Sequence, residues 1–224
     1  MRNKGVVYIA FSNKTKHTHL ANDHYINEAI FSAKSIKKLH PKLHITLFSD
    51  IDPQQDCFDA VKIVAIDCIR VKQELLLQSP YKRTLYLDSD TGIVGPIEEV
   101  FDLLDRFDLA ATHDLMRKDK KKSDVYPEYS DIPDGFSELA GGVILFKKSK
   151  AITKFFSLWK KNYKSWCKLS GTQSDQAPFR VSVWQSDVAL YILPPEYNIR
   201  TKKYDNITQR VYHHHNMYKL GIVS

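Results

Sequence analysis

The chain has 224 residues, 43% of them hydrophobic and 26% charged, and a formal net charge of +7. This length allows one ordinary domain with a sizeable core, and a second full domain would be cramped. The composition is typical of a globular protein, and no apolar run approaches the roughly 18 residues of a membrane-spanning helix. Three cysteines without metal-type spacing indicate a reducing compartment, so we expect a cytoplasmic protein.

The first expected element lies close to the N-terminus. Residues 6–11 form a continuous apolar run, which is typical of a buried parallel strand. Arg2 and Lys4 in front of this run could suggest a signal peptide. No small-residue cleavage site follows, however, and residues 12–24 are polar. We therefore interpret the run as the first strand.

Strand and helix patterns alternate through the first half of the chain. One helix is expected where apolar residues recur every three or four positions, with Asp23 as a candidate N-cap and Pro41 beyond its end. The alternation predicts an α/β fold, with a mostly parallel sheet covered by helices on both faces. The further strands expected here are 43–48, 61–66 and 84–87, and the helices are 23–38 and 69–78.

The second half of the chain is less regular. A polar stretch, 114–134, shows no periodicity, and such loops in compact domains are usually functional or disordered, so we expect a mobile lid or an acceptor loop. Gly141 and Gly142 are expected to open a strand over 143–146. The other expected elements are helices at 97–104, 149–166 and 175–185 and strands at 107–112, 189–193 and 210–215.

Two carboxylates, Asp88 and Asp90, flank one residue directly after an expected strand. Ligands of parallel sheets bind at the carboxyl ends of the strands. A carboxylate pair there can hold a hard divalent cation, and the cation can hold a diphosphate and stabilise it as a leaving group. The pattern alone is weak, because Asp50 and Asp52 form a second copy that also follows a strand.

The surroundings of the first pair distinguish it from the second. Lys72 stands sixteen positions before Asp88 in the segment KQELLLQSPYKRTLYLDSDT, residues 72–91. This segment resembles the core of nucleotide-diphospho-sugar transferases of the GT-A fold, and is especially similar to the glycogenin-like and galactosyltransferase-like group. Weaker matches occur in family order over about 6–221, which implies a single GT-A domain spanning 1–224. These matches are Tyr25 to Ser35, Leu139 to Ile144, Asp175-Gln176, and His213 with Lys219 six positions on.

The resemblance implies a metal-dependent glycosyltransferase that uses a nucleotide sugar, with UDP as the expected nucleotide and a carbohydrate or other hydroxyl acceptor. It implies Mn²⁺ or Mg²⁺ held by Asp88, Asp90 and His213, although His215 shares a strand face with His213. Lys72 and Lys219 would neutralise phosphate charge, and Gly141 and Gly142 would let the backbone approach the sugar closely. The implied donor-binding residues are Ala10, Phe11, Tyr25, Lys72, Ser89, Gly141, Gly142 and Lys219, and the implied catalytic residues are Asp175 and Gln176.

The sequence also departs from the pattern of this family. Ala140-Gly141 stands where the family often has Asn or Ser before the glycine equivalent to Gly142. Thr172 and Gln173 stand where the group has a further aspartate, which leaves retention or inversion of the sugar configuration open.

Two other functions fit parts of the sequence. Residues 85–91 resemble the motif of haloacid-dehalogenase phosphatases, in which Asp88 would be a nucleophile. Gly92 departs from that motif, and the chain has no Asp-Asp pair. The basic charge and twelve tyrosines could form a nucleic-acid surface, but no such module is visible and the basic residues are scattered outside 117–122. We expect no nucleic-acid partner and no transmembrane segment.

Overall fold

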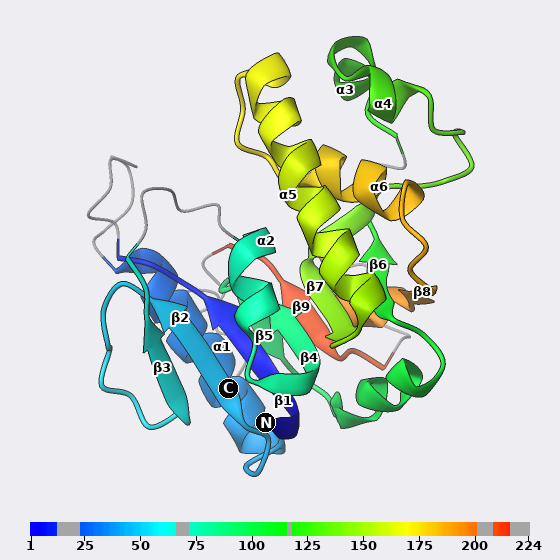
Figure 1. Cartoon of the computed structure of the whole chain (residues 1–224). Coiled ribbons are helices and arrows are strands. Elements are labelled where there is room, and N and C mark those ends of the chain that lie inside the picture. Colours follow the sequence, from blue (N-terminus) through cyan, green and yellow to red (C-terminus); the bar gives the residue numbers. More distant parts are fainter. Residues whose placement is uncertain (13–22, 66–71, 116–117, 201–207, 216–224) are drawn as a thin grey trace.

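A seven-stranded sheet forms the centre of the computed structural model, which describes residues 1–12, 23–65, 72–115, 118–200 and 208–215 (Figure 1). Its strands are β1 (Arg2–Ile9), β2 (Ile45–Ser49), β3 (Ala60–Ile63), β4 (Tyr81–Leu87), β6 (Leu109–His113), β7 (Leu139–Lys147) and β8 (Leu190–Leu193). Their order is β3-β2-β1-β4-β7-β6-β8. Neighbours are parallel except at β7, which is antiparallel to both β4 and β6. The expected mostly parallel sheet is confirmed.

Helices cover both faces of this sheet, as the alternation predicted. In Figure 1, α5 (Lys150–Ser170) lies in front of the sheet and α1 (His24–Leu39) behind it. Alternate residues of β1 join different cores because side chains of a strand alternate between its faces. Val6 and Tyr8 pack in the core under α1, and Val7 packs in the core under α5. Other helical elements are α2 (Lys72–Leu75), α6 (Gln176–Trp184) and the 3-10 turns η1 (Leu76–Gln78), η2 (Glu98–Asp105) and η3 (Pro195–Tyr197).

A second, two-stranded sheet joins the middle of the chain to its late part. Its strands, β5 (Thr91–Ile93) and β9 (Val211–His213), are antiparallel, and Thr91 is the register partner of His213. The sequence pattern predicts a strand near β9 but contains no indication of β5. The pairing carries His213 to the residues that directly follow β4.

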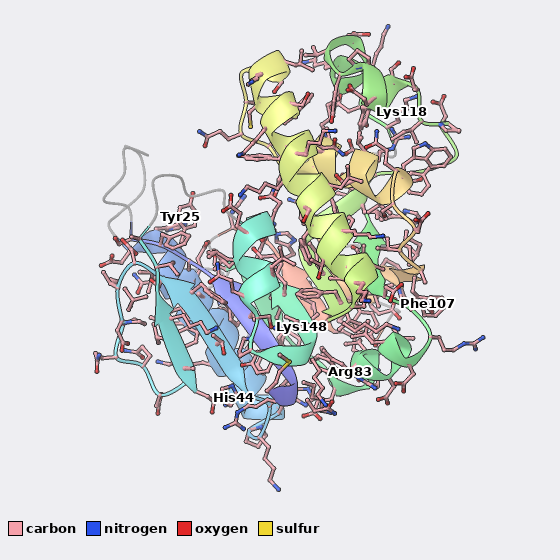
Figure 2. The ribbon with its side chains drawn as sticks, viewed as in Figure 1. Tyr25, His44, Arg83, Phe107, Lys118 and Lys148 are labelled. Carbon is pink, nitrogen blue, oxygen red and sulfur yellow. The ribbon has the colours of Figure 1, made fainter. Side chains whose placement is uncertain are left out.

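The polar stretch at 114–134 is more ordered than expected. Its described part contains two short helices, α3 (Lys120–Val125) and α4 (Pro127–Ser130). Tyr126 and Tyr129 are fully buried and pack with Trp166 of α5 and Val181 of α6. Figure 2 shows Lys118 beside these two helices, where its Nζ donates to the carbonyls of residues 130 and 132. The expectation of an unpatterned loop is therefore wrong here: a satellite core holds the segment.

Other expected boundaries need smaller corrections. Gly141 and Gly142 lie inside β7, which begins at Leu139, rather than opening the strand. Asp23 precedes α1 with a left-handed backbone, and its side chain makes no capping hydrogen bond. The helix expected at 97–104 is the 3-10 turn η2, and the first residues of the helix expected at 69–78 lie outside the described residues. In the part of the chain that the structure describes, no helix combines the length and apolar character needed to cross a bilayer.

Candidate active site

A cavity of about 320 Å³ opens where β1 and β4 end. The antiparallel strand β7 contributes its beginning to the same edge, because Leu87 pairs with Val143. Figure 2 shows Tyr25 at this edge of the sheet and His44, which precedes β2, at the opposite one. Every predicted site residue within the described chain lines the cavity, and Lys219 lies outside the described residues. These lining residues are Ala10, Phe11, Tyr25, Lys72, Asp88, Ser89, Asp90, Gly141, Gly142, Asp175, Gln176 and His213.

The turn that carries Asp88 and Asp90 is fixed by hydrogen bonds from both sides. The Asp88 amide donates to the Gly142 carbonyl at 2.8 Å, which continues the β4–β7 ladder beyond its last strand pair. The Thr91 hydroxyl donates to the Asp88 carbonyl at 2.8 Å and also bonds the Ser32 hydroxyl, which meets that of Tyr8. This buried chain links α1 and β1 to the turn and holds the two carboxylates at the mouth of the sheet.

Asp88, Asp90 and His213 form the group that could hold a metal ion. One ligand atom from each lies within 4.8 Å of the others. His213 Nε2 is 3.2 Å from Asp90 Oδ1 and 3.9 Å from Asp88 Oδ2. Its Nδ1 is 2.8 Å from Asn198 Oδ1, an acceptor, so Nδ1 carries a hydrogen and Nε2 is the ring nitrogen that faces the carboxylates. Two carboxylates and one imidazole suit a divalent cation such as Mn²⁺.

Asp90 stays ionised although it is buried. Burial alone would raise the pKa of its carboxyl, but hydrogen bonds from His213 and His215 outweigh it and hold that pKa far below the ordinary range. His215 Nδ1 lies 2.8 Å from Asp90 Oδ2, and this bond raises the pKa of His215. His213, the last residue of β9, and His215, two positions beyond it, therefore contact Asp90, one on each oxygen. Of the two histidines, His213 also lies near Asp88, with its Nε2 3.9 Å from Asp88 Oδ2.

Lys72 places a positive charge between two carboxylates of the cavity. Its Nζ donates to the Gly141 carbonyl at 2.8 Å and lies 3.1 Å from Asp88 Oδ1 and 3.3 Å from Asp175 Oδ2. Burial lowers the pKa of this lysine, but the attraction of Asp175 and Asp88 prevails and raises it. Tyr86 lies beneath, with its ring 4.8 Å from Nζ and its hydroxyl donating to Asp88. Lys72 is thus a fixed cation beside the candidate metal ligands.

The two glycines of β7 differ in what they make room for. A Cβ at Gly142 would overlap the ring of His213 and lie 3.0 Å from Asp88 Oδ2. A Cβ at Gly141 would lie at an ordinary 3.6 Å from Lys72 Nζ. Gly142 is therefore required by the packing of His213 against the sheet, whereas Gly141 contributes its carbonyl to Lys72.

The second carboxylate pair serves a different purpose. Asp50 accepts hydrogen bonds from the backbone and the hydroxyl of Ser12, just after β1. Asp52 is exposed and accepts from the Gln54 amide at 2.9 Å, as aspartates in turns often do. Neither residue lines the cavity. The pair at 50 and 52 shapes the loop after β2 rather than the candidate metal group.

Several residues of the site were not identified from the sequence. Tyr86 and Arg200 also line the cavity, and Asn198 and Glu138 contact residues that do. His215, the sequence-based alternative to His213, lines the cavity as well. Tyr86 could have been found, because it lies two positions before Asp88 and so on the same strand face. Asn198 and Glu138 stand in no motif, and only the tertiary fold brings them to the cavity.

Comparisons with known proteins relate this architecture to sugar-transferring enzymes. No protein-family model and no curated protein matches the sequence. Among solved structures, the chain is similar to the galactosyltransferase LgtC in complex with donor and acceptor sugar analogues. The TM-score is 0.60 and the sequence identity is 15%, and the match covers 94% of this chain and 86% of that chain. The chain is also similar to mouse xyloside xylosyltransferase 1 in its apo form, with a TM-score of 0.62 and 13% sequence identity. That match covers 94% of this chain and 97% of that chain. The likeness shows that the chain has the GT-A fold.

Proposed function

We propose that this protein is a metal-dependent glycosyltransferase that moves a sugar from a nucleotide-diphosphate donor to a hydroxyl acceptor. The observation that carries the proposal is the group formed by Asp88, Asp90 and His213 at the ligand-binding edge of a GT-A sheet. The galactosyltransferase that the chain resembles was solved with donor and acceptor sugar analogues. Neither a phosphatase nor a nucleic-acid-binding protein gains comparable support from the fold or the cavity.

The donor we propose is a UDP-sugar, bound with Mn²⁺ or Mg²⁺. Asp88, Asp90 and Nε2 of His213 would hold the ion, which when bound supplies positive charge to the leaving diphosphate. Lys72 lies beside this group and would add a second positive charge at the phosphates. We assign the same task to Lys219 from the sequence alone.

The remaining walls of the cavity are assigned to the base, the ribose and the sugar. Ala10, Phe11 and Tyr25 form the wall at the end of β1 and the start of α1, which we assign to the base. Ser89 lies between the two aspartates, and its hydroxyl is 3.4 Å from the buried carboxylate of Glu28, so it suits a ribose hydroxyl. Asp175 and Gln176 lie at the start of α6, where their oxygens would face the transferred sugar.

Asp175 has the electrostatic character that its proposed role requires. Lys72 lies 3.3 Å from its carboxylate, which favours the ionised form. An ionised carboxylate can accept a hydrogen bond from a sugar hydroxyl or stabilise positive charge developing at the anomeric carbon. The site would thus pair positive charge, from Lys72 and from the metal ion when bound, with negative or dipolar groups at the start of α6.

The cavity and the cysteines bear on the organisation and location of the protein. Residues from β1 through β9 contribute to this cavity, which supports a single catalytic domain over 1–224.

Cys57 and Cys167 are free thiols, and we propose a cytoplasmic location on the basis of the cysteine pattern.

The proposal is tested by measuring UDP release from a panel of UDP-sugars with Mn²⁺, with Mg²⁺ and with EDTA. We expect slow donor hydrolysis with at least one sugar, dependent on the metal and accelerated by a hydroxyl acceptor. An aryl phosphate serves as the counter-substrate. Hydrolysis of the aryl phosphate, without turnover of any UDP-sugar, would instead indicate a phosphatase.

A further inference from the structure

A fully buried carboxylate, Glu138, lies immediately before β7 and next to the candidate site. Lys122 Nζ contacts its two oxygens at 2.9 and 3.0 Å, and the Tyr129 hydroxyl donates to Oε1 at 2.6 Å. Oε2 accepts a hydrogen bond from Gln176 Nε2 at 3.1 Å. A buried ion pair contributes little net stability compared with well-packed apolar side chains. The presence of this charge next to Gln176 therefore calls for a reason other than stability.

The contact with Glu138 decides which way the Gln176 amide points. An ionised carboxylate only accepts hydrogen bonds, so the nitrogen of the amide, rather than its oxygen, must face Glu138. The carbonyl Oε1 is then the polar atom left for the cavity, which Gln176 lines next to Asp175. Within the described part of the chain, no group donates a hydrogen bond to Oε1.

We propose that Glu138 is a positioning residue, which holds the Gln176 amide with its carbonyl oxygen toward the donor sugar. The proposal rests on the function proposed above, because it gives Gln176 a part in sugar transfer. With this orientation, positive charge that develops at the reacting carbon faces two oxygens, one from Asp175 and one from Gln176. The opposite orientation would present an N–H dipole of the wrong sign to that charge.

The first test is Glu138→Gln, measured by donor hydrolysis. An amide at 138 can either donate or accept, so it no longer dictates the orientation of Gln176. We expect kcat to fall by about 100-fold, the lower end of the loss seen when one oriented hydrogen-bonding group is removed from a catalytic site. The affinity for UDP with Mn²⁺ should stay unchanged, because Lys72 and the metal group contact neither Glu138 nor Gln176 in the structure.

The matched control is Tyr129→Phe, which removes the hydrogen bond to Oε1 and leaves the Oε2 bond to Gln176 intact. It should lower the free energy of unfolding and leave kcat unchanged. If Tyr129→Phe lowers kcat as much as Glu138→Gln does, Glu138 is merely structural. In a Gln176→Ala background, Glu138→Gln should cause no further loss of kcat, because a residue that acts through another has no effect once its partner is gone. Additive losses would overturn the proposal.

A spectroscopic measurement separates this inference from the proposed function. The side-chain amide protons of Gln176 can be followed by ¹H–¹⁵N NMR in the full chain. We expect one of them to be shifted downfield in the wild type and in Tyr129→Phe, and to return to an ordinary position in Glu138→Gln. Equal positions in all three proteins would refute the Glu138 contact. Absence of turnover with every donor would refute the proposed function, and the NMR result would still decide the orientation of the amide.

Discussion

At the scale of single residues, the orientation of His213 depends on one amide. Asn198 is buried, and its Oδ1 accepts from His213 Nδ1 while its Nδ2 donates to Thr112 Oγ1 at 3.0 Å. The hydrogen bond to Thr112 therefore anchors the Asn198 amide beside the histidine. Partners of this kind orient metal-binding histidines in proteins generally.

We expect Asn198→Leu to lower the affinity for Mn²⁺ by about 10- to 100-fold, the usual effect of removing a group that orients a metal ligand. The leucine keeps the side-chain volume but cannot accept the Nδ1 hydrogen, so the imidazole is free to turn. Isothermal titration with Mn²⁺ in the presence of UDP measures the change. The control is Tyr212→Phe, which changes a side chain on the opposite face of β9 and should bind Mn²⁺ as tightly as the wild type does. Equal Mn²⁺ affinities in all three proteins would contradict the assignment of His213 as a ligand.

The two carboxylate pairs provide a second test at this scale. Asp90→Ala should abolish metal-dependent hydrolysis of the donor, because it removes the carboxylate that both His213 and His215 contact. Asp52→Ala in the second pair should leave most of the activity, because Asp52 is exposed and only caps a turn. UDP release with Mn²⁺ is measured for each variant. Full activity in Asp90→Ala would show that the ion binds elsewhere.

At the scale of elements, one buried side chain links the α3–α4 segment to α6 by hydrogen bonds. Arg180 of α6 is fully buried, and its guanidinium donates to the carbonyls of Phe136, Tyr129 and Pro133 at 2.8, 3.0 and 3.1 Å. Its charge also lies over the ring of Tyr129, at 4.5 Å from the centroid. The same helix begins at Gln176, so this attachment also holds the start of α6 at the cavity.

Arg180→Met should lower the free energy of unfolding by about 3 kcal/mol, because it leaves three buried carbonyls without their donor. Chemical denaturation in urea measures the loss, with the exposed Arg106→Met as the control for removing an arginine charge. A loss as small as that of the control would mean that the three carbonyls are satisfied in another way.

A pH-dependent contact joins α1 to the start of β2. Asp59 Oδ2 accepts from the Ile45 amide at 2.8 Å and from Lys37 Nζ at 2.6 Å. Partial burial opposes ionisation of this carboxyl, but the hydrogen bond from Lys37 and that from Ile45 prevail and lower its pKa. A carboxyl whose pKa is lower in the folded state stabilises the protein above its unfolded pKa, near 3.9, and loses this effect as the pH falls through the folded value.

Asp59→Asn should therefore destabilise the protein at pH 7, by about 1 kcal/mol after solvent screening. The difference from the wild type should shrink as the pH falls below about 4, where the wild-type carboxyl also becomes neutral. Urea unfolding at several pH values measures it, with the exposed Asp102→Asn as the control. A difference that does not change with pH would exclude the charge as its cause.

At the scale of the whole molecule, the sequence predicts most of the sheet and misses what depends on distant partners. Apolar runs such as 6–11 identify central strands because both faces of those strands are buried. The same patterns cannot show β5, whose three residues become a strand only by pairing with β9. They also miss α3 and α4, since Tyr126 and Tyr129 become core residues only against Trp166. For the site, motif order locates the cavity, whereas Asn198 and Glu138 require the folded chain.

Ligand binding should stabilise the whole molecule in a metal-dependent manner. Because the cavity joins elements from β1 to β9, a ligand there binds the folded chain and not the unfolded one. UDP at 100 times its Kd should add about 2.7 kcal/mol to the free energy of unfolding. Thermal unfolding with UDP and Mn²⁺ should therefore show a larger rise in Tm than unfolding with UDP and EDTA. Equal shifts in the two conditions would exclude a role for the cation in nucleotide binding.

The pairing of β5 with β9 has a consequence for how the protein matures. Asp88 and Asp90 leave the ribosome long before His213, and the register of Thr91 with His213 is what unites them. Contacts between residues so far apart in the chain form slowly, after local structure. A nascent chain that has not yet reached His213 lacks the imidazole of the group, so a metal ion cannot serve as an early nucleus for folding. The ion would instead stabilise a sheet that is already assembled, and the capacity to bind it would report that β5 and β9 have paired.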